Sequence, residues 1–173
     1  MTENKLPYSE PVRLHQIGTS LSRSLEPDAA QRARIAKALD LVSLENFTAD
    51  LNVVPTVSGW RMTGRVIADV VQACGLTLEP LPSHIDRDFT VNLVEKLEVP
   101  VNEDGEIDIE LDDEFPDEVE EGKIDLGQYA VEQLFLSLDP FPRKEGAVFE
   151  QPPEPVEISP FAALQALKDK SQG

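Results

Sequence analysis

The chain has 173 residues, of which 33 are acidic and 15 are basic, and its formal net charge is -18. That acidity argues against a general phosphate-binding surface, because lysine and arginine supply the affinity for a nucleic-acid backbone. It suits a basic partner, whose encounter an acidic surface speeds, although such charge often serves solubility alone. One cysteine excludes an internal disulfide, and one cysteine with two histidines is a poor set for a closed zinc site.

The totals also indicate one domain with tails. The length suits a single core that folds without disulfides. The N-terminus lacks the apolar run of a signal peptide, and no stretch approaches the ~20 apolar residues of a membrane helix. With one free cysteine, the simplest compartment is the reducing cytoplasm. We expect a disordered lead over residues 1–10, an α+β domain over residues 11–150, and a proline-rich tether with a short helix over residues 151–173.

Strand and helix signals alternate at the start of the domain. Val12–Ile17 and Leu21–Leu25 predict two short strands, separated by the turn residues Gly18-Thr19-Ser20. Glu26-Pro27-Asp28 then opens an alanine-rich helix that runs to about Asp40, since proline and an acid mark a helix start.

The next region alternates with a period of two, which a half-buried strand requires. Residues 47–54 predict one strand, and a turn over residues 55–59 leads into a longer one that starts at Trp60. We expect that strand to run to about Leu78, with a bend at Gly75. Its mostly apolar face holds Trp60, Met62, Gly64, Val66, Ala68 and Val70, and its polar face starts with Arg61, Thr63 and Arg65.

The prolines within Glu79–Ser83 are expected to break the pairing before a further strand over residues 89–93. Residues 100–122 differ in kind, because about a dozen acids and no base lie between Glu103 and Glu121. Like charges repel, so we expect a mobile loop there. It would contain a short edge strand formed by Ile107, Ile109 and Leu111.

Ile124–Leu138 is the clearest predicted helix. Asp125 is placed to cap its N-terminus, Gln128 takes the reciprocal capping-box position, and prolines follow its end. Consecutive strands with short turns imply an antiparallel meander. The predicted fold is therefore α+β: an antiparallel sheet of about five or six strands, meander-like and open to barrel-like closure, with two main helices and flexible tails.

No catalytic or metal-binding constellation stands out. Cys74 falls on the apolar face of its predicted strand, where a small buried hydrophobe is the simplest explanation. A nucleophile would need a nearby base, and neither His15 nor His84 lies in a motif. We expect no catalytic residue, no metal and no cofactor.

Two small basic spots and one acidic run are the candidate contact sites. Arg61 and Arg65 share a strand face, and Arg143-Lys144 forms the second spot. Ion pairs with the chain's own acids explain these cations most simply, and RNA contact is the alternative. A basic partner would meet the acidic run, represented by Glu103, Asp104, Glu106, Asp112, Asp113 and Glu114. Phe161–Lys168 could dock on a partner or fold back on the domain.

Three segments together carry a resemblance: Gly64–Pro80, Gly122–Phe149 and Ser159–Lys168. In this order they resemble the bacterial YceD family, the large ribosomal RNA subunit accumulation proteins, over roughly residues 45–170. The matching motif residues are Cys74, Glu79, Pro80, Asp125, Asp139, Pro140 and Arg143. Some relatives carry a Cys-x-x-Cys-like pair, which this chain lacks, and that speaks against a metal or redox role for its cysteine.

The resemblance implies a role in the synthesis, processing or stability of 23S ribosomal RNA, without a known catalytic activity. We expect a cytoplasmic factor that binds a basic large-subunit ribosomal protein or an RNA–protein assembly intermediate, with no membrane and no small-molecule substrate. One alternative is direct RNA binding through Arg61, Arg65, Arg143 and Lys144, which requires these residues to converge. Another is a metal-dependent hydrolase or nuclease, which requires convergent carboxylates in a preorganised pocket.

Overall fold

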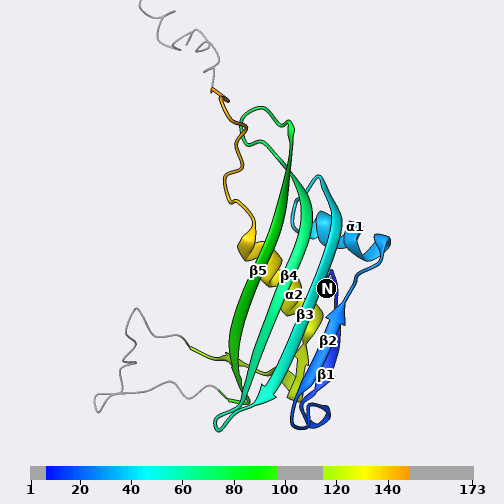
Figure 1. The fold of residues 1–173 in the computed structure, drawn as a ribbon, viewed down its shortest axis with the longest axis vertical. Helices are drawn as coiled ribbons and strands as arrows, with labels where there is room; N and C mark the ends of the chain where they lie inside the picture. The colour runs from blue at the N-terminus through cyan, green and yellow to red at the C-terminus, as the bar shows by residue number, and fades with distance from the viewer. Residues whose placement is uncertain (1–6, 97–114, 149–173) are drawn as a thin grey trace, which may run out of the picture.

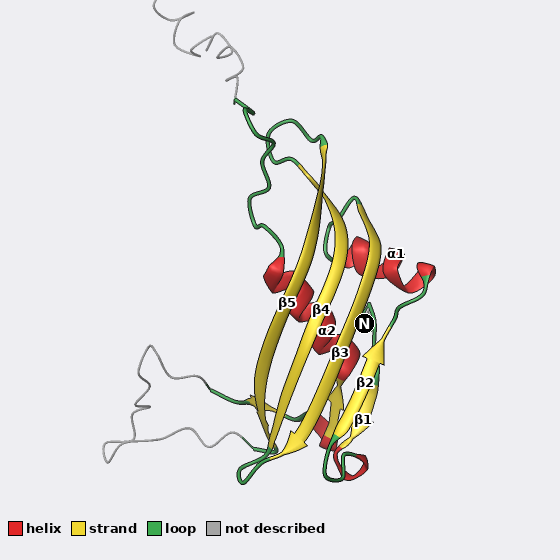
Figure 2. Cartoon of the chain, viewed as in Figure 1, coloured by secondary structure: helices red, strands yellow, loops and turns green. Residues whose placement is uncertain are grey.

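Three long strands with alternating apolar residues form the frame of the molecule. The computed structural model describes residues 7–96 and 115–148, which form a five-stranded sheet, a two-stranded sheet and two α-helices (Figure 1, Figure 2). The strands are β1 (Pro11–Arg13), β2 (Leu21–Leu25), β3 (Ser43–Pro55), β4 (Trp60–Ala73), β5 (Pro80–Val94), β6 (Asp117–Glu118) and β7 (Lys123–Asp125), and the α-helices are α1 (Ala29–Ala38) and α2 (Leu126–Ser137).

The larger sheet has the order β2-β3-β4-β5-β6, and β1 pairs with β7 in the smaller one. Neighbouring strands are antiparallel except for β5 and β6, which run parallel. The predicted α+β class and meander-like order are therefore confirmed. The sheet stays open, so the barrel-like closure is not found.

One face of the larger sheet is buried under both helices. α1 packs on β3, and α2 packs on β4 and β5 (Figure 2). Apolar side chains of the strands meet Ile35 of α1 and Leu134 of α2 in one core. The buried strand positions include Phe47, Ala49, Leu51 and Val53 in β3 and Met62, Val66, Ala68 and Val70 in β4. Period-two alternation thus predicted the buried face correctly.

The central strand ends earlier than its pattern predicts. β4 stops at Ala73, and Cys74–Glu79 forms a turn, whereas the sequence predicted strand to about Leu78. Two backbone bonds close the reversal: the Cys74 amide donates to the Glu79 carbonyl at 2.8 Å, and the Leu78 amide donates to the Cys74 carbonyl at 2.9 Å. Leu78 adopts a left-handed backbone (φ 59°), which an apolar pattern does not reveal.

The prolines after this turn do not break the pairing, contrary to the prediction. Pro80 and Pro82 lie inside β5 and pair in register with β4. β5 is the edge strand there, since β6 pairs only with Leu93 and Val94 among the described strands. In an antiparallel pair, successive residues of a strand point their N–H groups alternately toward the partner and away from it. Because Glu79 is hydrogen-bonded to Cys74, the nitrogens of Pro80 and Pro82 point away from β4, toward the edge, where no N–H donor is needed.

The N-terminal part differs from prediction in two places. Tyr8 lies within the expected disordered lead but is buried in the core. The strand predicted over Val12–Ile17 stops at Arg13, because Leu14–Gln16 forms a 3-10 turn instead. β1 pairs with β7 rather than with the strand that follows it.

Both helices are capped by an aspartate: the sequence predicted Asp125 as a cap, and it predicted Asp28 only as part of a helix start. The Asp28 side chain accepts from the Gln31 amide, and the Gln31 side chain accepts from the Asp28 amide, which completes a capping box. At α2, Asp125 accepts from the Gln128 amide at 3.0 Å. The reciprocal bond predicted there is not made, because the Gln128 side chain donates to Glu132 instead.

Several predictions lie outside the described residues. They concern most of the acidic run, including Glu103, Asp104, Glu106, Asp112, Asp113 and Glu114, the edge strand at Ile107, Ile109 and Leu111, and the helix at Phe161–Lys168. Within residues 7–96 and 115–148, no helix is both long enough and apolar enough to cross a membrane.

Candidate functional site

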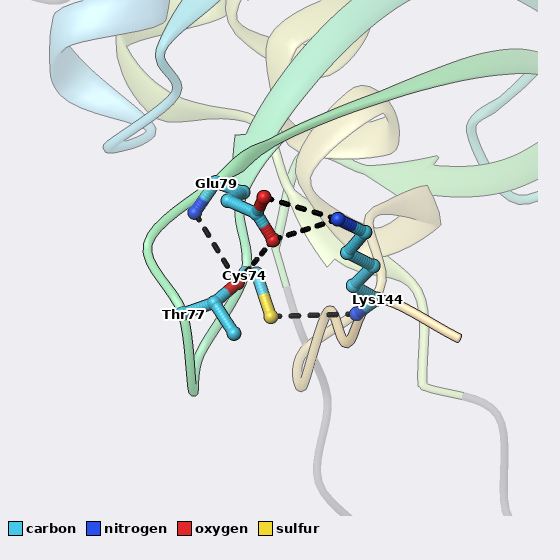
Figure 3. A network of polar contacts seen from close by, with 4 residues as sticks. All are labelled: Cys74, Thr77, Glu79 and Lys144. Carbon is cyan, nitrogen blue, oxygen red and sulfur yellow. Dashed lines mark hydrogen bonds and ion pairs between the residues drawn. The ribbon is translucent and has the colours of Figure 1, made fainter. Parts of the chain in front are cut away.

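The segment after α2 is fastened across the β4–β5 turn (Figure 3). The Gly75 amide donates to the Pro142 carbonyl at 2.8 Å, and the Lys144 amide donates to the Cys74 sulfur at 3.3 Å. Pro140 and Pro142 follow the end of α2 and prevent the helix from continuing, so the backbone groups beyond it are free to bond the turn. We call this site the junction: it joins the β4–β5 turn, residues 74–79, to the segment after α2, residues 139–144, which is far away in the sequence.

A second pair of bonds shapes the start of the same segment. The Gln72 side-chain amide, near the end of β4, donates to the Asp139 carbonyl at 2.9 Å. The Asp139 carboxylate accepts from the Phe141 amide at 2.9 Å, which is an aspartate turn around Pro140. The chain is therefore fixed to the sheet from the first residues beyond α2.

Cys74 lies inside this junction and is completely buried. Hydrogen bonds from Thr77 and from the amides of Lys144, Thr77 and Leu76 lower the pKa of the Cys74 thiol to about 6. The junction can therefore stabilise a thiolate, but solvent does not reach the sulfur. The prediction that Cys74 packs as a buried residue agrees with this burial, while its hydrogen-bond role was not foreseen.

Lys144 and Glu79 close the outer side of the junction. The Lys144 ammonium lies 3.0 Å from each Glu79 carboxylate oxygen, and the Thr77 hydroxyl donates to Glu79 at 3.0 Å (Figure 3). The hydrogen bond from Lys144 lowers the pKa of Glu79. Both side chains are about half exposed, at 52% and 49%, so water screens the pair and its contribution to stability is small.

The structure brings most of the family-motif residues together at this junction. Cys74 and Glu79 form its turn, Pro80 begins β5, and Asp139, Pro140 and Arg143 belong to the segment fastened across the turn. Sequence order alone separates the two groups widely. Their proximity arises because α2 crosses the sheet and the segment that follows it runs on to the β4–β5 turn (Figure 1).

Asp125 is the motif residue that lies elsewhere. Besides capping α2, its carboxylate accepts from the Glu10 amide at 2.8 Å and from the Ser9 hydroxyl. One side chain therefore holds the N-terminal segment against the first turn of α2. The sequence predicted the cap, but nothing in it indicated Ser9 and Glu10 as further partners.

The four proposed cationic contacts do not form one surface. Arg61 and Arg65 lie on the outer face of β4, and at ~3.3 Å per residue Arg65 is about 30 Å along the strand from Cys74. Arg65 makes a two-pronged pair with Asp86, with both N–O distances at 2.6 Å, and Arg61 donates to Asn92 at 3.3 Å. Arg143 and Lys144 belong to the opposite end of that strand.

Thr77 and Gln72 are junction residues that the sequence analysis missed. A threonine two residues before an acid in a turn is a recognisable local signal, because its hydroxyl can bond the turn. Gln72 carries no such signal, since its partner lies 67 positions away. Among residues 7–96 and 115–148, no group of three or more His, Cys, Asp or Glu side chains could hold a metal ion.

The fold and the junction define an acidic α+β protein with an open sheet. Hydrogen bonds at its junction join the β4–β5 turn to the segment after α2. Residues 62–168 match the family described as large ribosomal RNA subunit accumulation protein YceD. That match covers more than half of the chain, so the chain belongs to this family, and the resemblance found in the sequence is confirmed. The family has a role in the accumulation of large-subunit ribosomal RNA. No curated protein and no solved structure matches the chain.

Proposed function

We propose that this chain is a non-catalytic ribosome biogenesis factor that supports the synthesis, processing or stability of 23S ribosomal RNA. It does so by binding a basic large-subunit ribosomal protein or an RNA–protein assembly intermediate. Membership of the accumulation family is the observation that carries the proposal. The excess of 33 acidic over 15 basic residues supports a basic partner.

The physical basis is electrostatic. Unassembled ribosomal proteins that bind RNA carry many lysines and arginines, because phosphate contacts supply their affinity. An acidic chain attracts such proteins, speeds their encounter and competes for their cationic side chains until RNA displaces it. Binding of this kind weakens as salt screens the charges, so its salt dependence is its signature.

Direct RNA binding has less support. It requires Arg61, Arg65, Arg143 and Lys144 to converge, but Arg61 and Arg65 lie on β4, and Lys144 lies beside Cys74, beyond the far end of that strand. Arg65 and Lys144 are also paired with carboxylates. With a net charge of -18, such separated cations are a poor match for a phosphate backbone.

A binding experiment tests the proposed mechanism. Purified proteins of the large ribosomal subunit, freed of RNA, are titrated with the chain over a range of salt concentrations. We expect neutralisation of the acidic run to lower the affinity and flatten the salt dependence. The variant replaces Glu103, Asp104, Glu106, Asp112, Asp113 and Glu114 by the matching amides, and its control does the same to Glu26, Glu45, Asp50, Asp88, Glu95 and Glu145.

The control removes the same number of charges from other parts of the chain, so it separates position from net charge. Equal affinity and equal salt slope in the wild type and the acidic-run variant would refute the role of that run. In cells without the chain, we expect the ratio of 23S to 16S ribosomal RNA to fall, with rescue by the wild type. A ratio unchanged by removal of the chain would overturn the function itself.

A further inference from the structure

A groove of about 540 Å³ lies beside the junction, between the C-terminal ends of α1 and α2. Its walls come from three places: the end of α1, the end of β4, and the end of α2 with the segment that follows. The lining residues are Leu39, Asp40, Gln72, Ala73, Phe135, Leu136, Leu138, Asp139, Pro140 and Pro142. This volume is within the range of pockets that hold a small ligand or several side chains.

The groove is apolar and its large side chains are exposed. Phe135 is 57% exposed and Leu136 is 64% exposed, although both lie on a helix whose other face is in the core. Phe141, which lies between two lining prolines but does not line the groove itself, is 75% exposed. A single exposed leucine needs no explanation, but large apolar residues gathered along a groove mark an interaction surface.

The charged residues that line the groove are of one sign. Asp40 and Asp139 are the charged residues in its lining, and no cation within residues 7–96 and 115–148 makes an ion pair with either. Arg143 and Lys144 follow Pro142 without lining the groove, and Lys144 is bonded to Glu79. The surface therefore combines apolar contact area with two carboxylates that make no ion pair within the described residues.

The junction holds one wall of this groove in place. Gln72 bonds the backbone at Asp139, and the Gly75 amide bonds the Pro142 carbonyl, so the segment cannot move away from the sheet without losing both bonds. Asp139 and Pro140 are motif residues that line the groove directly. The buried cysteine and its neighbours thus act as positioning residues for a contact surface.

We propose that this groove is the docking site for a protein segment that presents aliphatic or aromatic side chains next to lysine or arginine. The proposal rests on the proposed function, since it names the surface through which a basic large-subunit protein is bound. Apolar side chains of the partner fill the groove, and its cations meet Asp40 and Asp139. A nucleic acid does not fit, because the carboxylates repel phosphate and the lining offers no cation.

Surface variants of the full-length chain test the groove. Phe135→Ala with Leu136→Ala removes the apolar contacts, and both side chains are exposed, so folding is preserved. Asp40→Asn with Asp139→Asn removes the charges, while asparagine tolerates the left-handed backbone of Asp40 (φ 54°) and keeps an acceptor for the Phe141 amide. The matched controls are Val57→Ala and Asp50→Asn, which lie outside the groove.

The probe is the RNA-free protein mixture from the large ribosomal subunit, with affinities measured for each protein that the wild type binds. We expect each groove variant to bind about tenfold more weakly or worse, since central apolar and charged contacts dominate interfaces. The controls should bind within about twofold of the wild type. Groove variants that bind as tightly as the controls would overturn the docking site and leave the proposed function standing. If the wild type binds none of the proteins, the proposed partner class fails as well.

A photo-cross-link identifies the occupant. A benzoylphenylalanine in place of Leu136 is irradiated with and without the ribosomal proteins, and the products are mapped by mass spectrometry. Cross-links to an aliphatic or aromatic residue near a lysine or arginine of a ribosomal protein support the proposal. Cross-links confined to residues 149–173 of the same chain, or to a second copy, would overturn it.

Discussion

Cys74 illustrates how the environment of a residue decides its role. On sequence evidence it is a small residue on an apolar strand face. In the structure it lies one residue beyond β4, fully buried, where its sulfur accepts a hydrogen bond from the backbone of Lys144. That bond holds the segment that forms one wall of the groove. A free cysteine can therefore be structural and still depend on polar contacts rather than on packing alone.

The depressed pKa of Cys74 predicts a pH-dependent contribution to stability. The ordinary thiol pKa is 9.0, and hydrogen bonds in the folded chain lower it to about 6. The folded state thus holds the thiolate more readily, so the stabilisation is complete above the ordinary pKa and is lost as pH falls through about 6. We expect the free energy of unfolding of the wild type to rise from pH 6 to 9 more steeply than that of Cys74→Ser. Urea titrations at each pH measure both, and parallel pH profiles would contradict the prediction.

At the scale of elements, α2 does more than cover the sheet. Its N-terminus holds the N-terminal segment through Asp125, and the chain beyond its C-terminus is hydrogen-bonded to the β4–β5 turn. Its apolar stripe, with Leu126, Ala130 and Leu134, is buried against β4 and β5. The helix therefore links the N-terminal segment, the sheet and the β4–β5 turn, which are distant in sequence. The end of α2 also supplies one wall of the groove.

Gly127 gives a test of this close packing. A Cβ atom at this position would lie 2.9 Å from the Glu10 amide nitrogen and 3.0 Å from the backbone of Ser9. In an exposed helix, alanine stabilises by ~1 kcal/mol relative to glycine. Here we expect Gly127→Ala to lower the free energy of unfolding, because the N-terminal segment must move away.

Gly75→Ala is the control for this prediction. Its Cβ would lie 3.6 Å from the Pro142 carbonyl oxygen, which is an ordinary contact. Both variants are measured by urea unfolding, with amide hydrogen exchange of residues 8–10 as a second readout. A Gly127→Ala variant as stable as the wild type, with unchanged exchange at those residues, would show that the contact is loose.

At the scale of the whole molecule, the sheet has two very different faces. One is covered by α1 and α2 (Figure 2). The other carries exposed polar side chains such as Thr63, Arg65 and Asp86. Among the described residues no polar or charged residue is buried, so their charges lie at the surface. With a net charge of -18, acids outnumber the bases available to pair with them.

This excess charge predicts that salt stabilises the chain. Repulsion among surface acids disfavours the compact state, and raising the ionic strength from ~0.01 M to ~0.15 M shortens the screening length from about 30 Å to about 8 Å. We expect the thermal unfolding midpoint to rise over this range of sodium chloride. The six-amide variant of the acidic run should rise by less, because it carries fewer acids. A wild-type midpoint that is flat or falls would contradict the prediction.

Four features were predictable from the sequence: the α+β class, the buried faces of β3 and β4, the start of α1 near Asp28 and the cap at Asp125. These features depend on neighbours a few residues away, through the period of two in strands and the first turn of helices. It also carried the family motif, although not the arrangement of the motif residues.

Three features depend on tertiary contacts that no local pattern predicts: the end of β4, the place of Pro80 and Pro82 in β5, and the contact of Cys74 with Lys144 across 70 positions of sequence. An edge strand tolerates prolines that an inner strand would not, and edge position is a property of the whole sheet. Local periodicity shows which face of an element is buried. It does not show that the segment after α2 covers the β4–β5 turn, because that contact depends on the path of every element between the turn and the segment. For that reason the groove beside the junction could not be predicted from the sequence, although the elements that form its walls could be.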